Sequence, residues 1–215
     1  DLYLVLVSIG AADLSAYALI AALLGGVLAP VYQRWGAARS KAWGLAVGYI
    51  AFVYCTIPIL PQVWGALADY TGGSVRYLGI AIVALVGAGL IAGVWRRARG
   101  RRWKVLLGLG LIAPIYAYLL YEYAKFPAER LHLVEYGFMG YVLLRGLRFD
   151  LRPALAYLVS FALAVLIGIG DECIQWALPQ RFFEVKDIQL NALSAALGLL
   201  LARLVGVAGD GDGKL

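Results

Sequence analysis

The sequence has little charge and no sign of a water-soluble domain. Only 15% of its 215 residues are Asp, Glu, Lys or Arg, and 63% are hydrophobic. Soluble domains have about 45–50% apolar and about 25% charged residues, so this chain lacks the charges needed to cover a water-exposed surface. Apolar windows of the roughly 20 residues that cross a bilayer recur along its whole length. The composition therefore indicates a membrane protein in contact with a lipid bilayer.

Several motifs that would indicate other classes of protein are also missing. There is no Rossmann or P-loop glycine pattern, which argues against a nucleotide-binding domain. The two cysteines, Cys55 and Cys173, lie far apart, and we interpret both as small apolar residues rather than as a disulfide or redox motif. His132 is the only histidine, and no second His or Cys stands at ligand spacing from it. We therefore predict no metal site and no cofactor.

The apolar windows predict an all-α polytopic bundle of about seven transmembrane helices. The predicted helices are 2–32, 42–60, 75–95, 103–123, 128–147, 153–176 and 187–207. The first is long and carries Asp13, so it is either one tilted span or a span with an interfacial extension. The chain starts at Asp1, and we leave open whether a signal or a further helix precedes it.

The positions of Lys and Arg predict how these helices are oriented. Basic residues are concentrated in 34–41, 96–104, 145–152 and 203–214, all on one side of the predicted membrane. Because basic loops stay on the cytoplasmic side, we predict a multi-pass protein of the bacterial cytoplasmic (inner) membrane, with its N-terminus outside and its C-terminus in the cytoplasm. The net charge of +6 then reflects topology and contact with anionic lipid, not nucleic-acid binding.

Three short stretches hold almost every polar group outside the basic loops. In the predicted topology they lie at the outer ends of helices 128–147, 153–176 and 187–207, and spacings of three or four residues place the groups of each stretch on one side of its helix. Ionisable groups at membrane depth are expensive and usually functional. We therefore predict one outer-face polar cluster, made up of Glu129, His132, Tyr136, Glu172, Gln175, Arg181, Asp187 and Asn191.

Each member of this polar cluster also has a structural interpretation. Arg181 is the best candidate for a ligand-facing cation, since a guanidinium binds phosphate or carboxylate bidentately, but it could instead pair with Glu172 or Asp187. Asp187 also stands where a helix N-cap would stand. His132 could carry a proton or simply form an interhelical hydrogen bond. Asp171 points about 100° away from Glu172 around the helix, so we expect no carboxylate pair there.

Small residues predict that the last two helices pack closely. Ala164 and Gly168 form one small-x-x-x-small pattern, and Ser194 and Gly198 form another. Such patterns let helix backbones approach each other in a membrane. We therefore expect helices 153–176 and 187–207 to be in close contact.

The order and spacing of these motifs resemble the VanZ-like family of small bacterial membrane proteins. The resemblance covers approximately residues 110–207, and Ser194 stands where the family typically has a glycine. It divides the chain into N-terminal transmembrane helices (1–109), a VanZ-like helical region (110–207) and a flexible tail (208–215). The matching motifs are His132-x-x-x-Tyr136, Glu172-x-x-Gln175, Pro179-x-Arg181 and Asp187-x-x-x-Asn191.

The resemblance implies a multi-span bacterial membrane protein, and the family's namesake is associated with resistance to the glycopeptide teicoplanin. Two functions fit the residues. In the first, the polar cluster binds or acts on an anionic or amphiphilic cell-envelope ligand, with Arg181 holding the anion and Glu172 and His132 available for proton transfer. In the second, the chain is a non-catalytic subunit that packs into a larger membrane complex, and the cluster only holds helices together. Whether any reaction is catalysed stays open.

Overall fold

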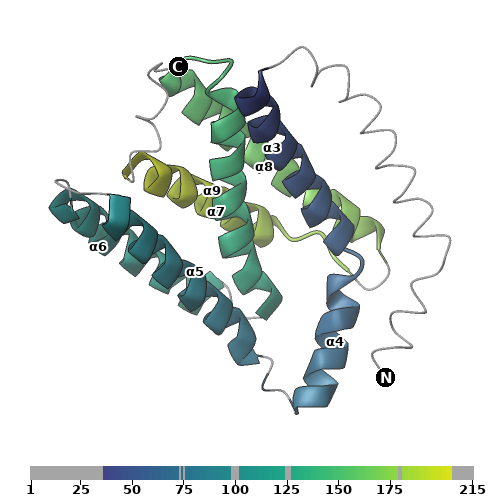
Figure 1. The fold of residues 1–215 in the computed structure, drawn as a ribbon. Coiled ribbons are helices and arrows are strands. Elements are labelled where there is room, and N and C mark those ends of the chain that lie inside the picture. Colours follow the sequence, from purple (N-terminus) through teal and green to yellow (C-terminus); the bar gives the residue numbers. More distant parts are fainter. Residues whose placement is uncertain are drawn as a thin grey trace.

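The protein is all helical wherever its structure is described. The computed structural model describes residues 36–72, 74, 76–97, 102–123, 127–178 and 181–204. The predicted helix 2–32 with Asp13, Pro179 and the tail 208–215 lie outside these residues. The helices, labelled in Figure 1, are α3 (Ala37–Thr56), α4 (Leu60–Thr71), α5 (Arg76–Arg97), α6 (Arg102–Tyr118), the π-helical turn η1 (Leu119–Tyr123), α7 (Pro127–Leu147), α8 (Pro153–Ala177) and α9 (Val185–Leu204).

Three of the described helical segments are long and apolar enough to cross a membrane. They are Val105–Glu122 of α6 and η1, the whole of α8 and the whole of α9, and the bent pair α3–α4 makes a fourth if it counts as one span. α5 contains a shorter apolar stretch, Ile80–Gly93. α7 does not qualify, because charged residues such as Glu129, Glu135 and Arg145 interrupt its apolar sequence. The prediction of about seven spans therefore stays a prediction.

The predicted single helix 42–60 is wrong, because the chain bends there and forms a second helix. α3 ends at Thr56, α4 starts at Leu60, and the two axes differ by 59°. Pro58 has no N–H to continue α3, and Pro61 fits the first turn of a new helix, where an N–H would have no partner. α4 ends at Gly72, whose φ of 59° is the left-handed conformation that favours glycine.

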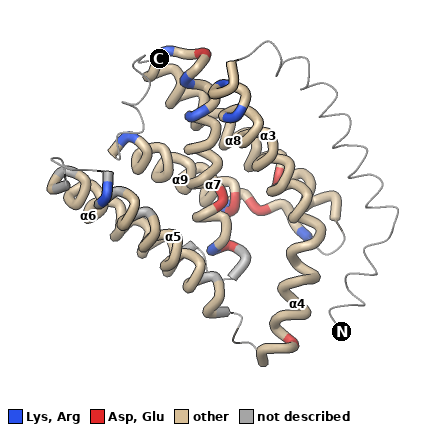
Figure 2. Tube along the Cα trace, in the orientation of Figure 1, with Lys and Arg blue, Asp and Glu red and all other residues tan. Residues whose placement is uncertain are grey.

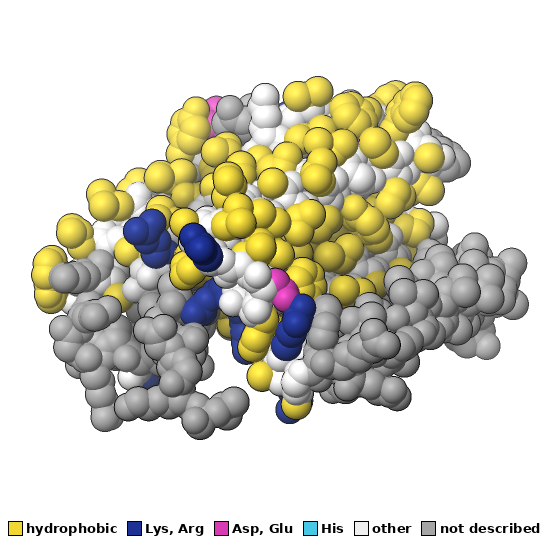
Figure 3. Space-filling view, turned by 90° about the horizontal axis from the view of Figure 1, so that it is seen from above, with side chains coloured by type: hydrophobic (Ala, Val, Ile, Leu, Met, Phe, Trp, Pro, Cys, Tyr) yellow, Lys and Arg dark blue, Asp and Glu magenta, His cyan; other side chains and the backbone are white. Residues whose placement is uncertain are grey.

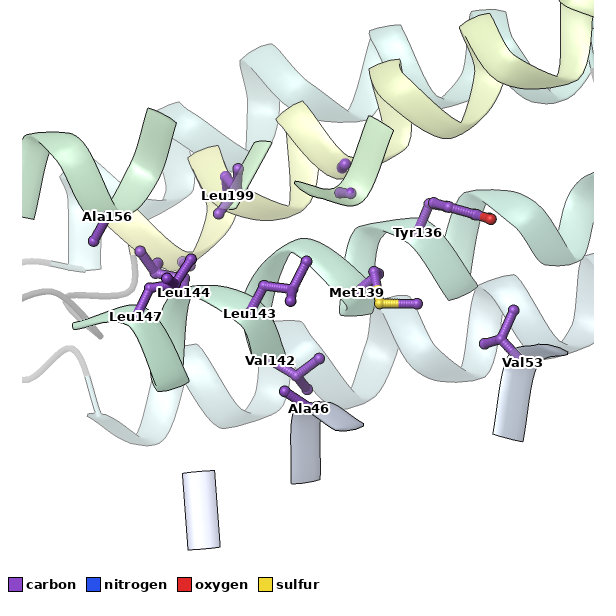
Figure 4. Packing of buried hydrophobic residues seen from close by; sticks show 13 residues of the cluster. Ala46, Val53, Tyr136, Met139, Val142, Leu143, Leu144, Leu147, Ala156 and Leu199 are labelled. Carbon is purple, nitrogen blue, oxygen red and sulfur yellow. The ribbon is translucent and has the colours of Figure 1, made fainter. Parts of the chain in front are cut away.

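α7 is the central helix of the bundle. It contacts α3, α5, α8 and α9 (Figure 1). Figure 4 shows its side chains packed against Ala46 and Val53 of α3, Ala156 of α8 and Leu199 of α9. The neighbouring helices therefore shield α7, which explains how the helix with the most charge can occupy the middle of an apolar bundle. The core residues of α7 are Leu133, Tyr136, Met139, Val142, Leu143, Leu144 and Leu147.

The small residues of α9 face a different partner from the one predicted. α8 and α9 do approach closely, since a Cβ added to Gly168 would lie 3.2 Å from Cβ of Asn191. Gly198, however, packs on α7: a Cβ there would overlap the backbone of Gly137. A Cβ on Gly140 would likewise lie 3.0 Å from the carbonyl oxygen of Ala195. The small residues of α9 thus mainly allow α7 and α9 to pack closely against each other.

Basic and acidic residues gather at different places in the bundle. Figure 2 shows Lys and Arg mainly at the start of α3, in the turn between α7 and α8 and at the end of α9, whereas most acidic residues lie where α7, α8 and α9 meet. Asp150 at the basic end and Lys186 beside Glu129 are exceptions. The described surface seen from above is largely hydrophobic, with the basic side chains grouped in one region (Figure 3). The orientation in the membrane stays a prediction.

Asp150 connects two elements at the basic end. Its Oδ2 accepts a hydrogen bond of 2.8 Å from Trp43 Nε1 of α3, and its Oδ1 pairs with Arg39. Because both groups are partly exposed, we expect Asp150→Ala to lower the free energy of unfolding by only about 1 kcal/mol. Unfolding by SDS titration measures this, and a loss of several kcal/mol would contradict so modest a role.

Candidate ligand-binding site

Asp171 is the centre of a buried hydrogen-bond network between α7 and α8. Its side chain accepts a hydrogen bond of 3.0 Å from the Tyr136 hydroxyl and one of 2.9 Å from Gln175 Nε2. Arg181 in turn donates to Gln175 Oε1. Asp171 is only 1% exposed, so these bonds supply the partners that a buried carboxylate requires. The network connects α7, α8 and the segment that leads to α9.

Asp171 is the principal residue that the sequence reasoning missed. The predicted cluster does not include Asp171, because its side chain points about 100° away from that of Glu172 around the helix. The two carboxylates do diverge, but both are buried: Asp171 meets Tyr136 of α7, and Glu172 meets the segment after α8. The available signal was the spacing of Asp171 and Gln175 at i, i+4 in an apolar helix, which places an acceptor beside an amide donor.

Of the two alternatives for Arg181, the salt bridge with Glu172 or Asp187 is not formed in the structure. Within the described part of the chain Arg181 makes no ion pair, and its partner is the amide of Gln175. Glu172 Oε2 instead accepts the backbone N–H of Glu184 at 2.8 Å. The reason is that the chain after Leu178 turns so that the backbone of Glu184, rather than the guanidinium of Arg181, reaches Glu172. Arg181 therefore keeps donors that a ligand could use.

Three members of the predicted cluster, His132, Asp187 and Asn191, have buried polar atoms without a hydrogen-bond partner. Asn191 is 0% exposed, and neither its Nδ2 nor its Oδ1 is paired. His132 Nδ1 is also unpaired, and lies 3.8 Å from Glu135 Oε2 and 4.0 Å from Asp171 Oδ2. Buried polar atoms are normally satisfied by protein or by ordered water. These atoms therefore leave hydrogen-bonding capacity for a water or a ligand.

A cavity of about 300 Å³ opens beside the network. On one side it is lined by the end of α3 and by α4, with mainly apolar side chains such as Ile57, Leu60 and Trp64. The Trp64 Nε1 donor is buried and has no partner. The volume lies at the lower end of the range for small-molecule sites. The polar residues on the opposite side are His132, Glu135, Asp171, Gln175 and Arg181.

Two of the predicted residues, Glu129 and Asp187, do not line this cavity and lie close to each other. Glu129 in the first turn of α7 pairs with Lys186 Nζ at 3.0 Å. Asp187 lies near Glu129 in the first turn of α9. Its interpretation as N-cap is wrong, because α9 begins two residues earlier, at Val185. The predicted cluster thus has one part around the cavity and another at the starts of α7 and α9, and Glu172 lies between them, with hydrogen bonds from Gln175 and from the backbone of Glu184.

A comparison with protein families decides the family of this chain. The family model described as VanZ/LLP1 matches residues 46–206, about three quarters of the sequence. The chain belongs to the VanZ/LLP1 family. This confirms the resemblance, and because the match begins within α3, both sides of the cavity lie inside the family region. No curated protein and no solved structure matches the chain.

Family membership and the helical fold together support a VanZ-like membrane protein. Among the described residues, three helical segments, or four if the bent pair counts as one, are long and apolar enough to span a bilayer, and the exposed side chains include many large apolar ones. The number of spans, the inner membrane of a bacterium and the division at residues 109 and 110 stay predictions. The roles of the predicted site residues are likewise matters for experiment.

Proposed function

We propose that the protein binds the polar end of a membrane amphiphile in the cavity between α3–α4 and α7–α8. The observation that carries this proposal is the two-sided character of the cavity. One side offers apolar side chains for a hydrocarbon chain, and the other offers a cation, carboxylates and an amide for a headgroup. Ligand pockets typically combine an apolar lining with a few convergent polar groups.

The charges of the cavity narrow the kind of headgroup. Arg181 can hold a phosphate or carboxylate, but Glu135 and Asp171 lie on the same side of the cavity. A purely anionic group would be repelled by these carboxylates. The headgroup that fits best combines an anionic group, which meets Arg181, with hydrogen-bond donors, which meet Asp171 and Glu135. Phosphatidylethanolamine carries such a headgroup, whereas phosphatidylcholine has the phosphate but no donor.

Trp64 provides a direct measurement of binding. Bromine atoms on lipid acyl chains quench tryptophan fluorescence at short range, and Trp64 lines the cavity. We expect brominated phosphatidylethanolamine in mixed micelles to quench the purified protein saturably, and brominated phosphatidylcholine to do so more weakly. The Trp64→Phe variant isolates the signal, because any quenching that persists in it comes from the other tryptophans. Equal quenching of Trp64 by both lipids would contradict the proposal.

Arg181→Gln tests the headgroup interaction. We expect at least a tenfold weaker affinity for phosphatidylethanolamine, equivalent to about 1.4 kcal/mol, because the phosphate loses a charge-assisted hydrogen bond. The matched control is Arg152→Gln, an exposed arginine at the start of α8, which should leave binding unchanged. Unaltered affinity in Arg181→Gln would rule out Arg181 as the headgroup ligand.

The same variant tests the cellular role implied by the family. If the amphiphile site underlies glycopeptide resistance, expression of the chain in a susceptible host should raise the inhibitory concentration of teicoplanin. Arg181→Gln should abolish that increase while the protein still reaches the membrane at normal levels. Resistance that survives in Arg181→Gln would separate this role from the cavity.

The alternative function is that of a non-catalytic subunit in a larger membrane complex. It is favoured by the closed part of the network, in which Tyr136, Asp171 and Gln175 satisfy one another. Such a network can hold helices together without any ligand. Purification in mild detergent separates the two functions: partners that co-migrate in a fixed ratio favour the subunit, and lipid-dependent quenching of a lone chain favours the binding site.

A further inference from the structure

Three carboxylates converge outside the cavity. Oxygens of Glu129, Glu184 and Asp187 all lie within 4.8 Å of one another. They come from two places in the chain: Glu129 lies in the first turn of α7, and Glu184 and Asp187 lie at the start of α9. None of the three lines the cavity. The sequence predicts no metal site, since no second His or Cys stands at ligand spacing from His132. That spacing cannot reveal acids that come together only in the folded protein.

Asp187 supplies a second observation that points to a ligand. It is only 8% exposed, and its Oδ1 is enclosed without any hydrogen-bond partner. Lys186 compensates part of the charge through Glu129, at 3.0 Å, and the positive end of the α9 dipole favours acids in its first turn. Neither effect provides a partner for the enclosed oxygen. A buried carboxylate beside two others requires a cation or hydrogen-bond donors.

We propose that Glu129, Glu184 and Asp187 bind a Ca²⁺ ion. Carboxylate oxygens are hard ligands, which Ca²⁺ and Mg²⁺ prefer to the softer transition metals. The three oxygens lie within 4.8 Å of one another, close enough for one cation to contact all three. Ca²⁺ suits such a carboxylate group better than Mg²⁺, because it accepts flexible coordination whereas Mg²⁺ demands near-ideal octahedral geometry and gives up its water reluctantly.

A bound ion would restrict the motion of the segment that carries Arg181. The side chain of Glu184 belongs to the Ca²⁺ site, while its backbone N–H donates to Glu172 of α8. Holding Glu184 between these two groups restricts the residues that connect α8 to α9. This Ca²⁺ site does not depend on the proposed amphiphile site, because its ligands and its readout are separate.

Calorimetric titration of the full chain with CaCl₂ tests the site directly. In an uncharged detergent we expect saturable binding of about one ion per chain, tighter for Ca²⁺ than for Mg²⁺. Asp187→Asn should weaken Ca²⁺ binding at least tenfold, because it removes a charged ligand but keeps the shape of the side chain. The matched control is Asp69→Asn, an exposed acid on α4, which should bind as the wild type does.

Lys186→Gln should shift the affinity in the opposite direction. Its ammonium competes with Ca²⁺ for Glu129, so its removal should tighten binding several-fold. Misfolding could weaken binding in Asp187→Asn but could not tighten it in Lys186→Gln, and size-exclusion profiles check both variants. The proposal is overturned if the wild type shows no saturable binding, if Asp187→Asn binds as well as Asp69→Asn, or if Lys186→Gln gives no gain.

Discussion

Replacing Gly198 with alanine is expected to lower the free energy of unfolding by about 3 kcal/mol, the upper end of the usual cost of overpacking. The added Cβ would overlap the carbonyl group and Cα of Gly137 on α7. Because these are backbone atoms, no rotamer change can relieve the contact, and α7 and α9 must move apart. SDS titration of the purified protein measures the loss, and we expect a reduced yield of monodisperse protein as well.

The control for this variant is Gly48→Ala on α3. Gly48 is also a helical glycine, but a Cβ there would meet nothing within 4 Å. Alanine is a better helix former than glycine by about 1 kcal/mol, so this variant should be neutral or slightly stabilising. If both variants behaved alike, the close approach of α7 and α9 would not be important for stability.

Tyr136→Phe is expected to cost about 1–3 kcal/mol of unfolding free energy, the range for leaving a buried group unsatisfied. The variant removes the hydroxyl that donates to Asp171 Oδ2 at 3.0 Å while it keeps the ring in the core. Asp171 then retains Gln175 as a donor but loses the donor from α7. The same SDS titration provides the measurement.

Tyr157→Phe on α8 is the matched control. The Tyr157 hydroxyl is also buried, but it has no hydrogen-bond partner, so its removal should be neutral or slightly stabilising. A comparable loss in both variants would mean that the ring environment, and not the hydrogen bond to Asp171, determines the effect. A loss confined to Tyr136→Phe would support the role of the network in joining α7 to α8.

Much of the helical fold could be predicted from the sequence, because apolar windows and charged breaks define the ends of long helices. The predicted helices 128–147 and 153–176 differ from α7 and α8 by one residue at one end. α4 is absent from the prediction because the predicted helix 42–60 runs through Pro58 and ends before Pro61, although two prolines three residues apart favour a break followed by a new helix. The central position of α7 could not be predicted, since it depends on contacts with α3, α5, α8 and α9.

The candidate site could be predicted only as a set of residues, not as an arrangement. Helical spacing correctly placed polar groups on one side of each helix, but it cannot say which neighbouring helix that side faces. In the structure, Gln175 forms hydrogen bonds with both Arg181 and Asp171, and Glu129 lies near Asp187. Helical spacing alone could not predict these partners. Trp64 and Glu135 were also missed, because their part in the cavity depends on the bend before α4.

The central position of α7 has a consequence for the order in which the protein is made. A charged residue in the middle of a lone transmembrane helix costs about 2.5–3.5 kcal/mol to insert, and α7 carries Glu135 among its apolar residues. α9, which has the most extensive contact with α7, follows it in the chain, as does α8. A ribosome therefore releases α7 before these two neighbours exist, and the bundle can close only after the last helix has been synthesised.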